Sequence, residues 1–142
     1  MTFKGAMFSS KTELWETPQA LFDELNREFD FTLDPCATPS NAKCKRFFTI
    51  EDDGLSQSWK NERVFCNPPY CRKVGRWVEK AASGEADLVV MLLFARTDTA
   101  WFHEHIYGRA EVRFLRGRLK FGTAKYNAPA PSMVVIFRRS EG

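Results

Sequence analysis

Residues 63–94 read RVFCNPPYCRKVGRWVEKAASGEADLVVMLLF, and this stretch decides the fold. It opens with an apolar strand, Arg63 to Cys66, which stops abruptly at two prolines. Apolar side chains then recur at helical spacing over residues 74–81, and Gly84 closes that helix. The run from Leu88 to Phe94 is continuously apolar, as in a central strand that is buried on both faces. A strand, a helix and a buried strand in this order predict an α/β fold.

The same alternation extends to both sides of this stretch. Toward the N-terminus, Thr17 is placed to cap a helix that begins at Pro18 and is apolar at positions 21, 22, 25 and 29. Toward the C-terminus, Thr97 is placed to cap a helix that Gly108 ends. Because no helix separates the last two strands, we predict an α/β sandwich with a mainly parallel sheet and one antiparallel strand near the C-terminus. The further strands are expected over residues 31–33, 47–50, 111–115 and 133–137.

The length of 142 residues is enough for one domain with a sizeable core. We therefore expect a single domain over residues 1–142, in which residues 1–14 form a loose lead-in. No apolar run is long enough to cross a membrane, and the first ten residues lack the apolar core of a secretory signal. A cytoplasmic location without membrane contact is expected.

The four cysteines are Cys36, Cys44, Cys66 and Cys71. Their spacings contain no Cys-x-x-Cys pair, and no His-x-x-x-His follows them, so we expect no metal site. A cytoplasmic location argues against disulfides, and free, partly buried thiols are expected.

Polar side chains directly follow three of the expected strands. Asp34 follows the first, Asp52 and Asp53 follow the second, and Asn67 follows the third. In a mainly parallel sheet, ligands bind beyond the carboxyl ends of the strands. These side chains are therefore expected to line a ligand site.

The turn Asn67-Pro68-Pro69-Tyr70 is a stiff array of hydrogen-bond acceptors. Proline has no N–H, and each proline keeps the residue before it out of helical geometry. The Asn67 side-chain oxygen and the Pro68 carbonyl can therefore accept both hydrogens of one planar amino group. These acceptors would stabilise the positive charge that grows when such a nitrogen attacks a methyl group, and Tyr70 offers a surface on which a base can stack. The turn predicts methyl transfer to an amino group, without a general base.

The carboxylates predict a site for a nucleoside cofactor that has an α-amino group. Asp34 can bind the amino group, and either Asp52 or Asp53 can bind the ribose hydroxyls or the adenine amino group. The cluster Trp15 to Pro18 either caps the following helix or lines the same pocket.

The net charge of +3 says little about partners, but the basic residues are unevenly distributed. One group lies between the first two strands and another lies in the last third of the chain, and both suit a phosphate backbone. The candidate nucleic-acid contacts are Lys43, Lys45, Arg46, Arg116, Arg118 and Lys120.

Taken in order, these motifs resemble the phage-type DNA N6-adenine methyltransferases, the Dam-like family, from Trp15 to Phe137. The resemblance rests on five ordered motifs: Trp15-x-Thr17-Pro18, Leu33-Asp34-x-x-Ala37, Asp53-Gly54-Leu55 with Trp59, Asn67 to Tyr70, and Gly117-Arg118-Leu119-x-Phe121.

The resemblance implies a Rossmann-like methyltransferase that uses S-adenosylmethionine and methylates N6 of adenine in DNA, in a bacterial host cell if a phage or prophage encodes it. It implies catalysis by Asn67 to Tyr70. It implies cofactor contacts from Thr17, Pro18, Asp34 and the acidic turn, in which either Asp52 or Asp53 is the ligand. Trp15, Cys36 and Ala37 are further candidates for the same pocket. In contrast to methyltransferases at large, the loop from Pro35 to Thr38 contains no glycine.

The chain is too short for a separate target-recognition domain, so recognition would come from loops, in a monomer or a homodimer. The residues leave other acceptors open: RNA, cytosine N4 or a protein glutamine amide. A non-catalytic module that binds nucleic acid with the same fold is the alternative from a different class.

Overall fold

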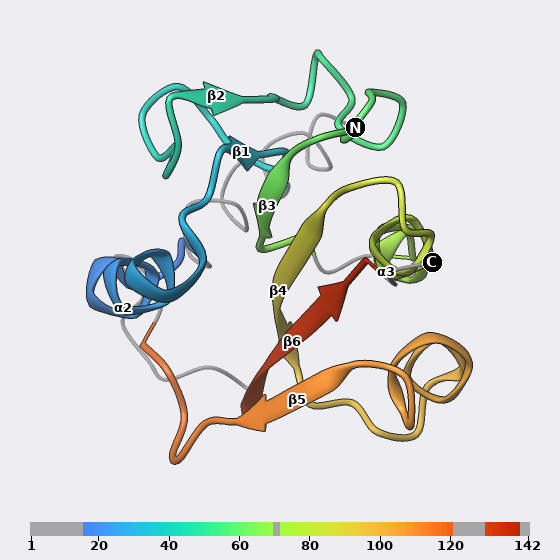
Figure 1. The fold of residues 1–142 in the computed structure, drawn as a ribbon. Helices are drawn as coiled ribbons and strands as arrows, with labels where there is room; N and C mark the ends of the chain where they lie inside the picture. The colour runs from blue at the N-terminus through green and yellow to red at the C-terminus, as the bar shows by residue number, and fades with distance from the viewer. Residues whose placement is uncertain (1–15, 70–71, 121–129, 140–142) are drawn as a thin grey trace, which may run out of the picture.

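The computed structural model describes residues 16–69, 72–120 and 130–139. Six strands form one sheet in the order β2-β1-β3-β4-β6-β5 (Figure 1). The strands are β1 (Leu33–Asp34), β2 (Arg46–Phe47), β3 (Arg63–Cys66), β4 (Leu88–Phe94), β5 (Glu111–Phe114) and β6 (Ser132–Arg138). The helices are α2 (Gln19–Phe29), α3 (Val74–Ala82) and a short π-helical turn, η1 (Phe102–Ile106).

The sheet is mainly parallel. Strands β2, β1, β3 and β4 pair in parallel, whereas β6 runs antiparallel to both β4 and β5. It follows that β5 points in the same direction as β4. The prediction of one antiparallel strand near the C-terminus is confirmed.

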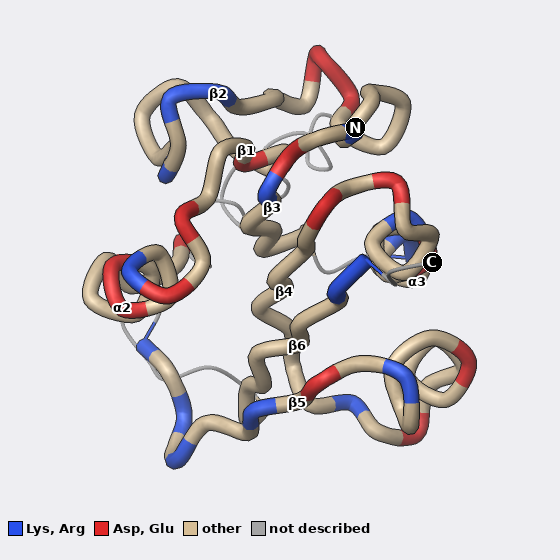
Figure 2. Tube along the Cα trace, viewed as in Figure 1, with Lys and Arg blue, Asp and Glu red and all other residues tan. Residues whose placement is uncertain are grey.

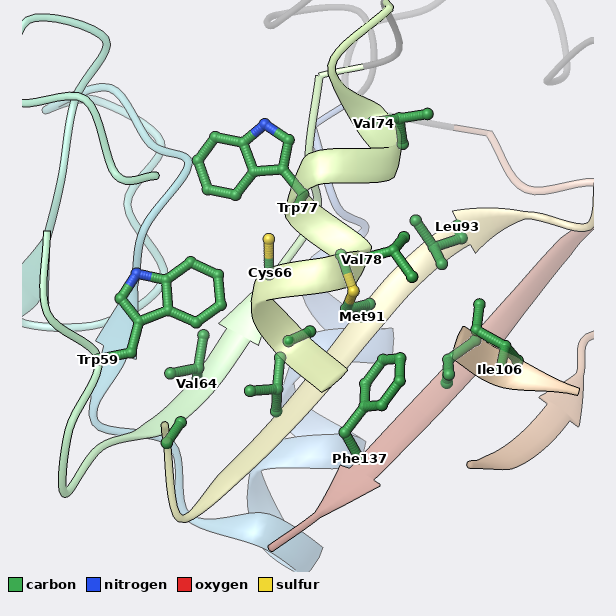
Figure 3. Packing of buried hydrophobic residues seen from close by; sticks show 14 of the residues in the cluster. Trp59, Val64, Cys66, Val74, Trp77, Val78, Met91, Leu93, Ile106 and Phe137 are labelled. Atoms are coloured by element: carbon green, nitrogen blue, oxygen red, sulfur yellow. The ribbon is translucent and has the colours of Figure 1, made fainter. Parts of the chain in front are cut away.

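Both faces of the sheet are covered, which explains why β4 is apolar throughout. Val89, Met91 and Leu93 belong to a core under α3 and η1, where Trp59 and Trp77 also pack (Figure 3). Val90 and Leu92, with the other alternate residues of β4, belong to a second core under α2. Figure 1 shows α2 and α3 on opposite sides of the sheet.

Helix α2 begins later than the sequence predicts. Its N-cap position is occupied by Pro18, with φ −56° and ψ 130°, and no side chain caps the helix. The predicted Thr17 cap is therefore wrong. The reason is that the Thr17 hydroxyl is bound by a side chain from another part of the chain, as described below.

The segment after β4 also differs from expectation. The hydroxyl of Thr99, not that of Thr97, accepts a hydrogen bond from the Phe102 N–H, at 3.3 Å. The Thr97 carbonyl instead lies 2.7 Å from Nε2 of His103. Within the described ranges, no helix separates β1, β2 and β3, so the alternation of strands and helices begins only at β3. No helix in the described part of the chain is long and apolar enough to span a bilayer.

Candidate functional site at the carboxyl edge of the sheet

The carboxyl ends of β1, β2, β3, β4 and β5 all meet at one edge of the sheet, because these five strands point the same way. We call this the carboxyl edge. The loops that leave it begin after Asp34, Phe47, Cys66, Phe94 and Phe114. The expected clustering of Asp34, the acidic turn and Asn67 at one edge is therefore what the topology produces.

Asp34 is a buried carboxylate, with 5% of its surface exposed. Its Oδ1 accepts a hydrogen bond from the Cys36 N–H at 3.2 Å, and its Oδ2 accepts one from the Lys43 N–H at 3.0 Å. Burial raises the pKa of Asp34 above its usual value, and the two backbone hydrogen bonds partly oppose that rise. Asp34 thus holds the loop of residues 36–43 by its amides. A carboxylate oxygen has two lone pairs, so each can still accept from a ligand.

The loop after β1 is kept in place without glycine. The Ala37 N–H donates to the Phe48 carbonyl at 3.0 Å, and the Thr38 N–H donates to Oδ1 of Asn41 at 2.7 Å. Cys36 points to the end of β3, where its Sγ lies 3.5 Å from Sγ of Cys66. Burial raises the pKa of the Cys36 thiol well above its usual range, so this thiol is neutral at physiological pH. Cys36, Cys44 and Cys66 are free, as predicted, and Cys71 lies outside the described residues.

Gly54, in the acidic turn of residues 51–54, allows this turn to approach the loop after β1 closely. A Cβ on Gly54 would lie 2.3 Å from the carbonyl oxygen of Pro35 and 3.0 Å from the ring of Trp77. The Gly54 carbonyl in turn accepts a hydrogen bond from Nε1 of Trp59 at 3.0 Å. Only a residue without a side chain fits between the Asp34 loop and α3, so the acidic turn is fixed against both.

The two carboxylates of the acidic turn have different surroundings. Oδ2 of Asp52 accepts hydrogen bonds from the N–H and the hydroxyl of Thr49, at 2.9 and 3.1 Å. Oδ2 of Asp53 accepts from the Ser56 hydroxyl at 2.6 Å, and the residue has a left-handed backbone with φ 55°. Asp53 also borders a shallow depression of about 510 Å³ between the turn and α3. Both side chains are exposed and accept hydrogen bonds from hydroxyls of their own turn, and Asp53 also lines the depression.

The Asn67 turn leaves β3 beside the start of α2. Nδ2 of Asn67 donates a hydrogen bond to Oγ1 of Thr17 at 3.0 Å. Pro68 is buried and Pro69 is exposed. Tyr70 and Trp15, which the sequence placed in the site, lie outside the described residues.

Two of the three residues in the first basic group, Lys43, Lys45 and Arg46, have partners within the chain. The Lys43 side chain is only 8% exposed; its Nζ donates to Oε1 of Gln19 at 2.8 Å and lies 3.7 Å from Oε1 of Glu16. Arg46 forms a salt bridge of 2.5 Å with Glu62, the residue before β3, and so lies toward the amino end of that strand. Lys43 and Arg46 are thus both paired with side chains of the chain itself. Lys45 is exposed.

The second basic group does lie at the carboxyl edge. Arg116, Arg118 and Lys120 follow β5 and are exposed. Figure 2 shows the basic stretches beyond β5 in blue. Sequence reasoning missed three further exposed basic residues at this edge: Arg72 and Lys73, which follow the Asn67 turn, and Arg96, which follows β4. Arg72 and Lys73 come just after the Asn67 turn, and Arg96 comes two residues after the apolar strand β4; these positions in the sequence were the signal that could have found them.

Charge therefore divides the carboxyl edge into two halves. The acidic half consists of Asp34, Asp52 and Asp53, after β1 and β2. Figure 2 shows the turn beyond β2 in red. The basic half, after β3, β4 and β5, consists of Arg72, Lys73, Arg96, Arg116, Arg118 and Lys120. An acidic residue, Asp98, follows Arg96 by two positions in the same half. No group of three metal-ligating side chains lies within the described ranges.

Comparison with known proteins now identifies the family. The family described as DNA N-6-adenine-methyltransferase (Dam) matches residues 4–141. A DNA N-6-adenine-methyltransferase of Haemophilus phage HP1 is 30% identical, over 96% of this chain and 85% of that protein. A DNA N-6-adenine-methyltransferase of Escherichia phage T1 is 33% identical, over 75% of this chain and 46% of that protein.

The chain belongs to the DNA N-6-adenine-methyltransferase (Dam) family. It is thus an enzyme of the class of adenine-specific DNA methyltransferases, as the ordered motifs predicted.

Proposed function

We propose that the chain transfers the methyl group of S-adenosylmethionine to N6 of adenine in DNA, at the turn Asn67 to Tyr70. The observation that carries this proposal is the position of Asn67 between the two halves of the carboxyl edge. The acidic half can bind the positively charged methyl donor, and the basic half can bind the DNA backbone. An amide between the two can hold the amino group of a base next to the donor. The Rossmann-like methyltransferase fold is part of the same proposal, and the sheet order with β6 antiparallel beside β4 supports it.

The residues of the acidic half fit the cofactor. Asp34 is buried and rigidly held, so its carboxylate can bind an α-amino group without losing side-chain freedom. Gly54 brings the acidic turn against Pro35, which leaves the Asp34 loop and Asp53 side by side. We propose that Asp53, rather than Asp52, binds the ribose hydroxyls or the adenine amino group. We place Cys36, Ala37 and Pro18 along the same pocket. When bound, S-adenosylmethionine supplies a methyl group on a positively charged sulfur.

The Asn67 turn performs the chemistry on the acceptor. The adenine N6 lone pair is delocalised into the ring, so the nitrogen is a poor nucleophile until it becomes pyramidal. Oδ1 of Asn67 and the carbonyl of Pro68 can accept its two hydrogens and stabilise the charge that develops during transfer. The extra proton leaves after the transfer, so no general base is required.

The basic half fits the DNA backbone. Arg72 and Lys73 follow the Asn67 turn, and Arg96 and Arg116 follow β4 and β5 at the same edge. An adenine must leave the base stack to reach Asn67, and cations around the turn can hold the phosphates on either side of it. Tyr70 is proposed as the surface on which the extruded base stacks.

A direct assay tests this proposal. The purified chain is incubated with labelled S-adenosylmethionine and unmethylated DNA, and the nucleosides are analysed by mass spectrometry. N6-methyladenine is the expected product. Label in cytosine, RNA or protein would show that the acceptor is a group other than adenine N6. Binding of S-adenosylhomocysteine without any methyl transfer would favour the non-catalytic module.

A further inference from the structure

The buried hydroxyl of Thr17 contacts the proposed catalytic side chain. Thr17 has 4% of its surface exposed, and its Oγ1 accepts the hydrogen bond from Nδ2 of Asn67 at 3.0 Å. We infer that Thr17 is a positioning residue, which orients the Asn67 amide for methyl transfer, and not a ligand of the cofactor. This inference rests on the proposed function of Asn67.

The hydrogen bond affects the amide in two ways. It restricts rotation about the terminal torsion of Asn67, which is otherwise broad, so the direction of Oδ1 is fixed before a base arrives. It also polarises the amide, because a hydrogen bond accepted from Nδ2 increases the negative charge on Oδ1. Both effects are stronger in a buried site than in water, since little solvent competes for the hydroxyl.

The distance between Thr17 and Asn67 is set by packing. Phe22, in the first turns of α2, makes an edge-to-face contact with Phe65 at 5.2 Å between ring centroids. Phe65 lies in β3 two residues before Asn67, and it is 1% exposed. The start of α2 and the end of β3 are therefore held by the same core. This explains why Thr17 is not available as a helix cap.

A second set of contacts ties the start of α2 to the Asp34 loop. Nζ of Lys43 binds Gln19 and Glu16, on either side of Thr17, while the Lys43 N–H donates to Asp34. The segment of residues 16–19 thus connects the acidic half to the Asn67 turn through side chains of its own. Through its hydrogen bond, Thr17 therefore couples the position of this segment to the orientation of the Asn67 amide.

The test separates chemistry from cofactor binding. Thr17→Val keeps the size and the branched shape of the side chain and removes only the hydroxyl. We expect the single-turnover rate of methyl transfer to fall by ~10-fold, the effect of one lost hydrogen bond to a reacting group. The Kd for S-adenosylhomocysteine, measured by calorimetry, should stay within about threefold of the wild-type value, below the ~10-fold that loss of a direct contact would cause. Thr17→Ser should restore most of the rate.

Thr32→Val is the matched control. Thr32 also has a hydroxyl in hydrogen bonds, to Glu62 at 2.8 Å and from the Arg63 N–H at 2.8 Å, but it precedes β1 and lies beside the amino end of β3. It should lower the melting temperature and leave the single-turnover rate unchanged. A drop in rate as large as that of Thr17→Val would show that both variants act through stability.

Three outcomes decide the inference. A Thr17→Val protein that binds S-adenosylhomocysteine ~10-fold more weakly at an unchanged single-turnover rate makes Thr17 a cofactor ligand and overturns it. A further loss from Thr17→Val in an Asn67→Ala background also overturns it, because a positioning residue has nothing to act on there. If Thr17→Val does not fold, hydrogen exchange of the Asn67 side-chain amide in the wild type decides: slow exchange supports the hydrogen bond and fast exchange refutes it. A wild type that methylates nothing contradicts the proposed function instead.

Discussion

The two halves of the carboxyl edge are built in opposite ways. The acidic half is held rigidly: Asp34 is bound by two amides, and Gly54 is wedged between Pro35 and Trp77. The basic half consists of exposed side chains in the segments that follow β3, β4 and β5. A small cofactor of fixed shape requires a preorganised pocket, whereas a phosphate backbone requires charge more than shape. The difference predicts that variants in the two halves change different binding constants, with Asn67 between them.

The largest effect is expected for Asn67→Ala. Removing one hydrogen-bonding group aimed at developing charge costs ~10²–10³-fold in rate. The Kd values for S-adenosylhomocysteine and for DNA should change little, because Asn67 belongs to neither half. Single-turnover kinetics and calorimetry measure the two quantities. A misfolded Asn67→Ala protein would assign the turn a structural role only.

The acidic half is tested by Asp34→Asn, which removes the charge and keeps the shape. Affinity for S-adenosylhomocysteine should fall by ~10-fold or more, the worth of a hydrogen bond to a charged group, with DNA affinity unchanged. Asp53→Asn should weaken cofactor binding more than Asp52→Asn. The reverse order would show that the cofactor lies on the other side of the turn.

The raised pKa of Asp34 has two consequences for pH dependence. Cofactor affinity should be lost on acidification at a higher pH than the ordinary aspartate value of 3.8. The contribution of this group to stability has the opposite sign. Because its folded-state pKa is above its unfolded value, that contribution is fully present below the unfolded pKa and is lost as the pH rises through the folded pKa. Calorimetric titrations across acidic pH measure the first effect, and the difference in melting temperature between the wild type and Asp34→Asn across the same range isolates the second.

Gly54→Ala tests whether the acidic half is as tightly built as the geometry indicates. The added methyl group meets a backbone oxygen, so the Pro35 loop must move, at a cost of ~1–3 kcal/mol in the free energy of unfolding. Urea denaturation measures this cost. Gly54→Ala should also impair cofactor binding more than Gly117→Ala does. Gly117 lies in the basic half, at a positive φ of 72°, and a Cβ there would meet nothing within 4 Å.

The basic half is tested by salt dependence. Arg96→Ala should weaken DNA binding and reduce the slope of log K against log salt by about one. Arg46→Ala is the control, since Arg46 is bound to Glu62 toward the amino end of β3. It should leave the slope unchanged. An equal effect from Arg46 would mean that DNA also contacts the amino end of the sheet.

The smallest effect is expected away from both halves. Hydrogen bonds from Arg138 and then Arg113 lower the pKa of Glu111, at the amino end of β5. The stability that this carboxylate adds is present above its unfolded pKa and is lost as the pH falls through its lowered folded pKa. Glu111→Gln should therefore reduce the loss of melting temperature between neutral and acidic pH. Activity at neutral pH should not change.

Local sequence predicted the elements whose bounds depend on local chemistry. The ranges 63–66 and 88–94 agree with β3 and β4, because proline and polar residues end each apolar run. The ranges expected for β1 and β2 were wrong by one to three residues. There the Phe48 N–H bonds to the Asp34 carbonyl, and the Thr49–Asp52 turn leads the chain away from the sheet.

The site was less predictable where partners are distant. Thr17 looks like a helix cap in its local sequence, and only the position of Asn67, fifty residues away, shows otherwise. Lys43 looks like a phosphate ligand until Gln19 and Glu16 are placed beside it. Predicting the basic half required the direction of β5, and this direction follows from the pairing of β5 with β6 and not from the residues of β5 itself.

The pairing of β4 with β6 also has a consequence for how the chain folds. This ladder, from Leu88 with Arg138 to Phe94 with Ser132, closes a loop that contains η1, β5 and all of the chain between them. Contacts so distant in sequence form slowly, because the entropy of the loop is lost before the ladder stabilises it. Arg96 and Arg116 both lie inside that loop, whereas Asp34 and Asn67 precede it. In a refolding experiment, competence to bind the cofactor should therefore appear no later than competence to bind DNA.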